Sequence, residues 1–415
     1  KFVLYTLFGS VLILVALIAL YLTNVRDFVD QRVVEARAEE IQKAEPSLTM
    51  EQARERVVIN SFDVVTLQKA GQAASLVLKG EQDRLAARGG EGEDAGKVGV
   101  LAPGVNPREA AARFDQPFFT PAMQYVLFAL LFIGFAVKVP LVPLHNWLPD
   151  AHVEAPTPVS MILAGILLKL GGYGIIRFAL PICPWAAEQL AWWVGLLGCV
   201  AIVYGALVAM GQSDFKRLLA YSSVSHMGYV ILGLALWSGT AGSQYWAWGM
   251  NGAMFQMVAH GISSAGLFFV VGVVYERAHH RDLSRLGGLK EPMPLYSGLS
   301  IVLFLAAMGL PGLSGFVGEF FVMVAAWHFN MWFSLAAILT TVLTASYLLW
   351  TWKRVYLGTN PAAADYPDLS LRETLCLLPF VLAAIALGVA PTFLLLQWME
   401  PSVTGLVESL ARLTG

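Results

Sequence analysis

Five ionisable residues lie deep within long apolar segments of this sequence, where a charge is costly. They are Lys138, Lys169, His226, His260 and Glu319. A charged side chain at the centre of a membrane-spanning helix costs roughly 2.5 to 3.5 kcal/mol on insertion scales, so such residues are kept where they pair or serve transport. A buried lysine can load and release a proton, and histidine changes charge near neutral pH. The set predicts a proton relay rather than a sodium or metal site, because a charged lysine offers donors and no lone pair.

Each of these residues also has a purely structural explanation. Lys138 is near enough to one end of its segment to extend its ammonium to the membrane interface, whereas Lys169 lies too deep for this. His226 and His260 have serines close by in the sequence, and a neutral imidazole bonded to serine joins helices. Glu319 can form a salt bridge that locks two helices together, for example to Lys169. The residue types alone leave these alternatives open.

Prolines interrupt two of the apolar segments beside these charges. Pro140 follows Lys138, and Pro311 precedes Glu319. Proline removes a backbone donor, and in a membrane the freed groups are tolerated only where protein or cavity water supplies partners. Two discontinuous helices are therefore predicted. Broken helices at matching places in two halves of opposite topology are typical of inverted-repeat transporters, whose ion sites lie near the bilayer midplane.

His145 and Trp147 follow the first of these interruptions, near the expected level of the lipid headgroups. An aromatic belt alone explains a tryptophan at this level. The alternative is that both residues serve proton uptake or gating on the cytoplasmic side, since histidine titrates near neutral pH.

The composition predicts that the chain is a membrane protein. It is 57% hydrophobic and 13% charged, with a mean hydropathy of +0.63, whereas soluble domains have about 25% charged residues. The formal net charge is −2 and no basic block is present, so nucleic-acid binding is not expected. Cys183, Cys199 and Cys376 are far apart without metal-ligand spacing, so we expect small buried apolar residues and no metal.

The long apolar segments predict an all-α polytopic membrane protein with about nine transmembrane helices. Their approximate bounds are 1–23, 122–148, 158–180, 189–212, 214–237, 249–275, 295–326, 331–356 and 372–397. The first segment has no initiator methionine or signal-peptide pattern, so we expect the chain to start within a longer protein. A helix, a polar insertion, the main transmembrane domain and a tail are predicted over 1–23, 24–117, 118–398 and 399–415.

The insertion, residues 24–117, holds more than half of the chain's charged residues. In its first half, VVEARAEEIQKA consists of good helix formers, and TMEQ at Thr49 to Gln52 fits a capping box. In its second half, the Gly-rich and charged run RGGEGEDAGKVGVLAPGVNP predicts a flexible loop. The loops SDFKR, ERAHHRDLSRLGGLK and TWKR carry the cations of one side, which is expected to be cytoplasmic. The insertion and the C-terminus are then expected on the opposite, positive side.

Four stretches of the sequence resemble the antiporter-like subunits of NADH-quinone oxidoreductase, respiratory complex I. They are AVKVPLVPLHNWLPDAHVEAPTPVSMILAGILLKLGGYGIIRF, SDFKRLLAYSSVSHMGYVILG, MVAHGISSAGLFFVVGVVYER and GLPGLSGFVGEFF. The resemblance covers residues 1–23 and 118–398, and its motifs are long and specific. It implies a proton-pumping subunit of fourteen helices, in which two five-helix inverted repeats build the channel. The first five helices of that subunit are absent from this sequence.

By motif, the resemblance implies a role for each buried ionisable residue. Lys138 matches the family's lysine in the first broken helix, and Lys169 matches its central lysine. Glu319 matches the exit-side carboxylate, and His226 and His260 match members of the hydrated axis. Glu319 also favours one of three subunit types, because the other two usually have lysine there. The glutamate that pairs with the first lysine belongs to the absent fifth helix, so Lys138 is expected to lack this partner.

The resemblance also implies how the relay is driven. The sequence has no P-loop, no Rossmann glycine pattern and no haem or iron–sulfur ligands, so the energy is expected to come from partners. No cofactor is expected in this chain; NADH, FMN, iron–sulfur clusters and quinone are expected in partner subunits. The expected partners are other membrane-arm subunits, including neighbouring antiporter-like subunits, within the lipid bilayer of a bacterial inner membrane.

Two other classes of function share this scaffold. One is a subunit of a multi-subunit cation/proton antiporter or of a hydrogenase-linked membrane complex, and the other is a non-transporting assembly element. Glu319 favours the complex I subunit over the first class, and the buried Lys169 argues against the second. The insertion is longer than the family's usual connection, and docking to a partner or a tolerated insertion would explain it equally well.

Overall fold

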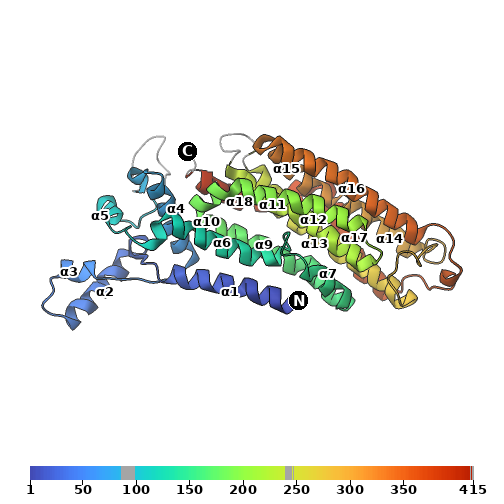
Figure 1. Cartoon of the computed structure of the whole chain (residues 1–415), viewed down its shortest axis with the longest axis horizontal. Helices are drawn as coiled ribbons and strands as arrows, with labels where there is room; N and C mark the ends of the chain where they lie inside the picture. Colours follow the sequence, from blue (N-terminus) through green and yellow to red (C-terminus); the bar gives the residue numbers. More distant parts are fainter. Residues whose placement is uncertain (86–98, 239–244, 246, 412, 414–415) are drawn as a thin grey trace. The chain divides into compact units, whose positions relative to one another are not determined.

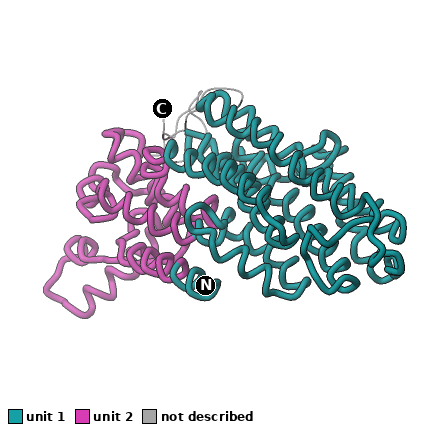
Figure 2. Tube along the Cα trace, turned by 45° about the vertical axis from the view of Figure 1, so that its right-hand side comes forward, with its two compact units in different colours: residues 1–8, 135–173, 191–411 teal, residues 9–134, 174–190, 412–415 magenta. Residues whose placement is uncertain are grey.

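The computed structural model describes residues 1–85, 99–238, 245, 247–411 and 413. Within these residues the chain is helical and has no β-strand, which confirms the predicted all-α class. Two compact units are distinguished in Figure 2. Unit 1 comprises 1–8, 135–173 and 191–411, and unit 2 comprises 9–134, 174–190 and the described part of 412–415.

Eight of the described helices are long and apolar enough to cross a membrane. Seven are single helices: α1 (Phe2–Tyr21), α6 (Pro121–Lys138), α11 (Pro184–Met210), α12 (Phe215–Ala235, extended to Ser238 by a 3₁₀ turn), α13 (Trp248–Ala278), α16 (Met331–Tyr356) and α17 (Leu371–Val389). The eighth, Thr157–Ile182, is composed of α8 (Thr157–Ile162), α9 (Leu168–Gly174), α10 (Leu180–Ile182) and two π-turns. The ninth predicted span is the shorter apolar pair α14 (Pro294–Ala307) and α15 (Ser314–Phe329). A further helix, α18, covers Gln397–Ala411.

Both predicted interruptions are present. Helix α6 ends at Lys138 and α7 (Trp147–Glu154) begins nine residues later, after a non-helical stretch that contains Pro140. The indole Nε1 of Trp147 donates to the carbonyl oxygen of Val137 at 2.8 Å. This bond satisfies a carbonyl at the end of α6 that has no helical partner, as a broken helix in a membrane requires. The second interruption lies between α14 and α15 and contains Pro311.

Two π-turns flank the middle of the Thr157–Ile182 segment, where the sequence predicts a regular helix. They cover Leu163–Leu167 and Ile175–Ala179, and α9 lies between them. A π-turn holds one residue more than an α-turn and leaves backbone groups imperfectly paired, which is why such turns are found at functional sites. Hydrophobic periodicity does not reveal an insertion of one residue in a segment that is apolar throughout.

Helix α13 lies at the centre of unit 1, where it packs against α12, α15 and α17 (Figure 1). A Cβ added at Gly252 of α13 would lie 2.9 Å from the carbonyl oxygen of Gly318 in α15. The two backbones therefore approach more closely than any larger residue would allow at this crossing. In the membrane-spanning stretches of α12 and α13, 94% and 78% of the residues are buried. A helix that is buried all round has no separate apolar stripe, because every side faces other parts of the protein.

The insertion begins with a small helical hairpin of α2 (Gln31–Ala44) and α3 (Met50–Glu55). The predicted capping box is present: Thr49 Oγ1 accepts from the Gln52 amide, and Gln52 Oε1 accepts from the Thr49 amide. The hairpin buries a cluster of apolar residues, namely Val34, Ala38, Ala53 and Val57. Part of the predicted flexible loop, residues 88–98, lies outside the described residues, and α5 (Pro107–Ala112) follows that loop.

Helix α4 (Val64–Leu78) departs from the solvated character predicted for the insertion. Its buried face consists mainly of small and apolar residues, among them Leu67, Ala70 and Ala74, and it packs against α10. A Cβ added at Gly71 would lie 2.2 Å from the carbonyl oxygen of Ile182. Composition averaged over the insertion conceals this helix, because charged residues surround an apolar run of only fifteen residues.

We predict that Gly71→Ala destabilises the protein by about 1 to 3 kcal/mol, because the new methyl group overpacks the contact with Ile182. Gly405→Ala is the matched control: Gly405 is also helical, and a Cβ added there meets no atom within 4 Å. The control is expected to be neutral or to stabilise by up to about 1 kcal/mol. Thermal unfolding of the two purified variants tests this, and equal midpoints would show that α4 does not pack tightly at Gly71.

Candidate functional site

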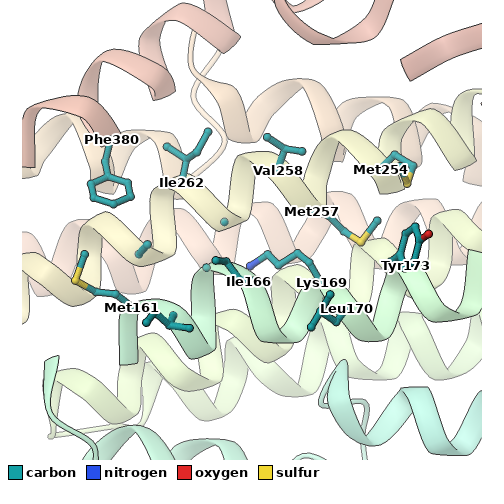
Figure 3. A pocket seen from close by; sticks show the side chains of 14 residues that line it. Met161, Ile166, Lys169, Leu170, Tyr173, Met254, Met257, Val258, Ile262 and Phe380 are labelled. Carbon is teal, nitrogen blue, oxygen red and sulfur yellow. The ribbon is translucent and has the colours of Figure 1, made fainter. Parts of the chain in front are cut away.

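Lys169 extends from α9 toward α13, at the floor of an apolar groove of about 650 Å³ (Figure 3). Its ammonium donates to the carbonyl oxygen of Ala164 in the first π-turn and lies 2.8 Å from Nδ1 of His260. It makes no ion pair with a carboxylate in the described part of the chain. The π-turn thus supplies an acceptor that holds a partly buried cation in place without neutralising it.

The walls of the groove come from four helices of unit 1 and the first π-turn. The helices are α8, α9, α13 and α17, of which α17 contributes Phe380. Lys169 is the one charged residue among the described residues that line it. Methionine, leucine and isoleucine side chains cannot hydrogen-bond to water, so they keep one flank of the lysine poorly hydrated, which strengthens electrostatic interactions there.

His260 connects Lys169 to α12. Its Nε2 lies 3.2 Å from Oγ of Ser223, and that hydroxyl donates to the carbonyl oxygen of Leu219 at 3.0 Å. Because the single proton of Ser223 is used in this way, its oxygen accepts from His260, which assigns the proton of the neutral imidazole to Nε2. Nδ1 is then free to accept from the ammonium of Lys169.

Glu319 and His226 form a buried pair farther along. Nδ1 of His226 lies 2.8 Å from Oε1 of Glu319, and Nε2 of Gln256 donates to the same oxygen at 2.9 Å. Glu319 is 3% exposed, and its second oxygen, Oε2, lies beside Gly309 in the α14–α15 interruption. The carboxylate is therefore next to the broken backbone, as the position of Pro311 predicts. The salt bridge to Lys169 is not formed.

The rings of His226 and His260 are 5.4 Å apart between centroids, so the two pairs are neighbours. No hydrogen bond joins the two rings, and Nε2 of His226 has no partner among the described residues, so a proton needs a bridging water to cross between them. Lys169, His260, His226 and Glu319 thus form one row, the polar axis, supplied by α9, α13, α12 and α15. Their role as proton carriers stays a prediction. Geometrically, the row can pass a proton from an amine through two imidazoles to a carboxylate.

Lys138 is not part of the polar axis. It is the last residue of α6, is partly buried, and makes no hydrogen bond or ion pair with any described residue.

His145 and Trp147 are both buried, at 3% and 0% exposure. The explanation of Trp147 by an aromatic belt is therefore wrong, because a belt residue contacts lipid headgroups, whereas this indole is bonded to the end of α6. The ring of His145 contacts Tyr204 and Tyr221 edge-on, and neither ring nitrogen has a hydrogen-bond partner among the described residues. Their predicted part in proton uptake stays a prediction.

Sequence reasoning missed three buried polar residues near these groups: Gln256, His152 and Lys216. Gln256 precedes His260 by one helical turn, so the spacing in the sequence indicated that Gln256 lies on the same helix face as His260. His152 follows His145 by seven residues, but His145 precedes the start of α7 at Trp147, so helical spacing gave no usable signal for His152. Lys216 belongs to the cation-rich SDFKR segment, and for that reason the sequence suggested an ordinary solvated lysine.

Cationic side chains fix the last turn of α7. Arg281 Nη1 donates to the carbonyl oxygen of Val153 at 2.8 Å, and Lys216 Nζ donates to that of Ala155 at 2.8 Å. Both cations lie at the negative end of the helix dipole.

Asp150 lies in the first turn of α7 and accepts hydrogen bonds from Lys1 and Arg217. The bond from Lys1 is the main cause that lowers the pKa of Asp150.

No group of three or more His, Cys, Asp or Glu residues with metal-binding geometry is found in the described ranges.

This chain is similar in sequence to known membrane proteins. The family described as NADH:quinone oxidoreductase/Mrp antiporter, transmembrane, matches residues 111–344. NADH-quinone oxidoreductase subunit M of Rhodobacter capsulatus is 44% identical over 302 residues, which are 71% of this chain and 57% of the relative. NADH-ubiquinone oxidoreductase chain 4 of Marchantia polymorpha is 40% identical over 70% of this chain and 57% of its own length. The chain thus spans a little over half of the curated relatives it matches.

The fold is also similar to that of chains in solved structures. A chain of respiratory complex I from Thermus thermophilus with bound NADH has a TM-score of 0.65 and 28% identity, over 100% of this chain and 75% of that one. A chain of the Mrp complex from Dietzia sp. has a TM-score of 0.60 over 99% of this chain and 76% of that one. At 19% identity, the second likeness concerns the fold alone.

Proposed function

The chain belongs to the NADH:quinone oxidoreductase/Mrp antiporter family, and from this premise we propose that it translocates protons as a membrane-arm subunit of an NADH-quinone oxidoreductase. The observation that carries the proposal is the polar axis from Lys169 through His260 and His226 to Glu319. The subunit M relatives support this type of subunit, and Glu319 is the residue expected for it.

The geometry supports one order of proton transfer. Lys169 gives a proton to Nδ1 of His260, and the proton on Nε2 leaves toward Ser223 and His226. His226 then passes a proton to Oε1 of Glu319, 2.8 Å away. After this transfer His260 carries its proton on Nδ1, so a turn of the ring or an exchange of protons with water must restore the Nε2 tautomer before Lys169 can pass the next proton. Glu319, at the α14–α15 interruption, would release the proton toward the positive side of the membrane.

The driving energy would come from quinone reduction in partner subunits, which would also hold NADH, FMN and the iron–sulfur clusters. Other membrane-arm subunits, including neighbouring antiporter-like subunits, would be the partners in a bacterial inner membrane. The alternative is a subunit of a cation/proton antiporter or hydrogenase-linked complex, and a chain of the Mrp complex shares the fold. A lysine at the head of the axis disfavours a path for metal cations, because an ammonium repels them and offers no lone pair.

We predict that Lys169→Met lowers the proton-pumping rate at least about tenfold while the complex still assembles, because methionine fills the same space but carries no proton. Lys169→Arg should also fail, since guanidinium does not release its proton at accessible pH. Lys353→Met, at an exposed lysine in the last turn of α16, is the matched control. Proton uptake into inverted vesicles and NADH oxidation are measured together; pumping by Lys169→Met at the wild-type ratio and rate would refute the relay.

A second prediction concerns Glu319. Glu319→Gln keeps the shape and the bonds to His226 and Gln256 but cannot cycle a proton, so it should assemble normally and lose coupled pumping. Glu319→Asp should retain part of the activity. The same vesicle assay decides. Loss of assembly in Glu319→Gln would instead show that the pair with His226 is a structural lock, and full pumping would remove Glu319 from the path.

A third prediction concerns topology: residues 24–117 lie on the positive side, as the cations of the opposite loops indicate. Met50 of α3 is 44% exposed and is a suitable site for Met50→Cys. In intact cells this cysteine should react with a membrane-impermeant maleimide. Labelling only after the cells are opened would reverse the proposed orientation.

A further inference from the structure

His152 is a buried histidine that the polar axis does not use. Its side chain is 0% exposed, and neither Nδ1 nor Nε2 has a hydrogen-bond partner among the described residues. Leaving a buried polar group unsatisfied costs about 1 to 3 kcal/mol, and native proteins seldom accept this without a functional reason. Two such atoms on one titratable ring mark His152 as a candidate site for exchange of protons with internal water.

Packing holds the ring in a fixed orientation. It stacks on Phe268 of α13 with 4.3 Å between centroids and 14° between planes. The backbone carbonyl of His152 accepts from Ser160 Oγ at 3.3 Å, and Arg281 and Lys216 hold the end of α7. Phe268 covers one face of the imidazole, and the edge of the ring, which carries both nitrogens, is where its hydrogen bonds would form.

The charged groups nearest His152 are cationic. Lys216, 3% exposed, donates to the carbonyl oxygen of Ala155, three residues after His152. Phe268, on which His152 stacks, follows His260 by about two turns of α13, and His260 lies 2.8 Å from the ammonium of Lys169. His152 is therefore placed near the Lys169 end of the polar axis and also near the cation-rich loops that end α7.

We propose that His152 is a further proton carrier, which collects protons from water at the end of unit 1 that bears Lys216 and delivers them to Lys169. This inference rests on the proposed function and adds the step that reloads the axis. A neutral imidazole takes a proton on its bare nitrogen and releases the proton of its other nitrogen, through water, to the free amine of Lys169. The imidazole is neutral before and after, and one proton has moved.

Electrostatics gives this step its timing. While Lys169 is an ammonium, an imidazolium at His152 would lie close to two cations, Lys169 and Lys216, and is disfavoured. Once Lys169 has passed its proton to His260, one of these cations is gone, and His152 can accept a proton. Reloading is thereby tied to prior discharge of the axis.

The simplest other explanation is that His152 only stacks on Phe268. His152→Phe separates the two, because a phenyl ring keeps the stacking and removes both nitrogens. The proposal predicts that this variant assembles, and that its pumping rate falls at least about tenfold. His328→Phe is the matched control, because His328 also stacks on an aromatic ring, that of Tyr245, with 4.1 Å between centroids. If His152→Phe impairs assembly, His152→Gln decides in the same way, since an amide hydrogen-bonds but does not carry protons.

A second readout separates a carrier from a packing residue. In His152→Ala, added imidazole should enter the space of the missing ring and restore pumping several-fold, whereas it should not help Lys169→Met. The assay uses the complete complex in inverted vesicles, with proton uptake compared with NADH oxidation. Wild-type pumping by His152→Phe, together with loss in Lys169→Met, would overturn this inference and leave the proposed function intact. Wild-type pumping by Lys169→Met would overturn the proposed function itself. No rescue by imidazole would also contradict the carrier role.

Discussion

The structure depends on one constraint: the hydrocarbon core of a membrane offers no water to bond polar groups, so each polar group there needs another partner. Each unpaired backbone or side-chain group in hydrocarbon costs several kcal/mol, so every break and every charge must be provided with a partner from the chain or from internal water. Trp147 meets this need at the end of α6, and Ala164 meets it for the ammonium of Lys169. Gln256 and His226 meet it for Glu319. In the polar axis, Lys169 is paired with His260, and His226 is paired with Glu319.

The same constraint explains why the axis runs through the best-buried helices. Most of the residues of α12 and α13 are buried by neighbouring helices, so His226 and His260 are shielded from lipid. Glycines at the crossings remove side-chain bulk and bring the helices together, which shortens the distance between carriers on different helices. Close packing and proton transfer therefore have a common structural basis.

Much of the fold and the identity of the axis residues could be predicted from sequence, because their signals are local. Prolines locate the interruptions, hydropathy locates the spans, and a charge in an apolar run is conspicuous. The π-turns beside Lys169 could not be predicted, since one extra residue leaves no trace in a segment without a polar face. Which nitrogen of His260 faces Lys169 also depends on Ser223 of another helix. Trp147 was misjudged because its depth depends on how the chain folds back at the break.

The backbone contact between Gly252 and Gly318 has a mechanical consequence. Where two helices touch through their main chains, sliding one past the other by even a fraction of a turn drives larger neighbouring side chains into backbone. The crossing of α13 and α15 therefore behaves as a stiff joint, and it holds Gln256 and Glu319 at a constant separation. Turnover at this joint would be expected to change protonation and side-chain torsions while the helix axes stay in place, in contrast to transporters in which whole bundles rock.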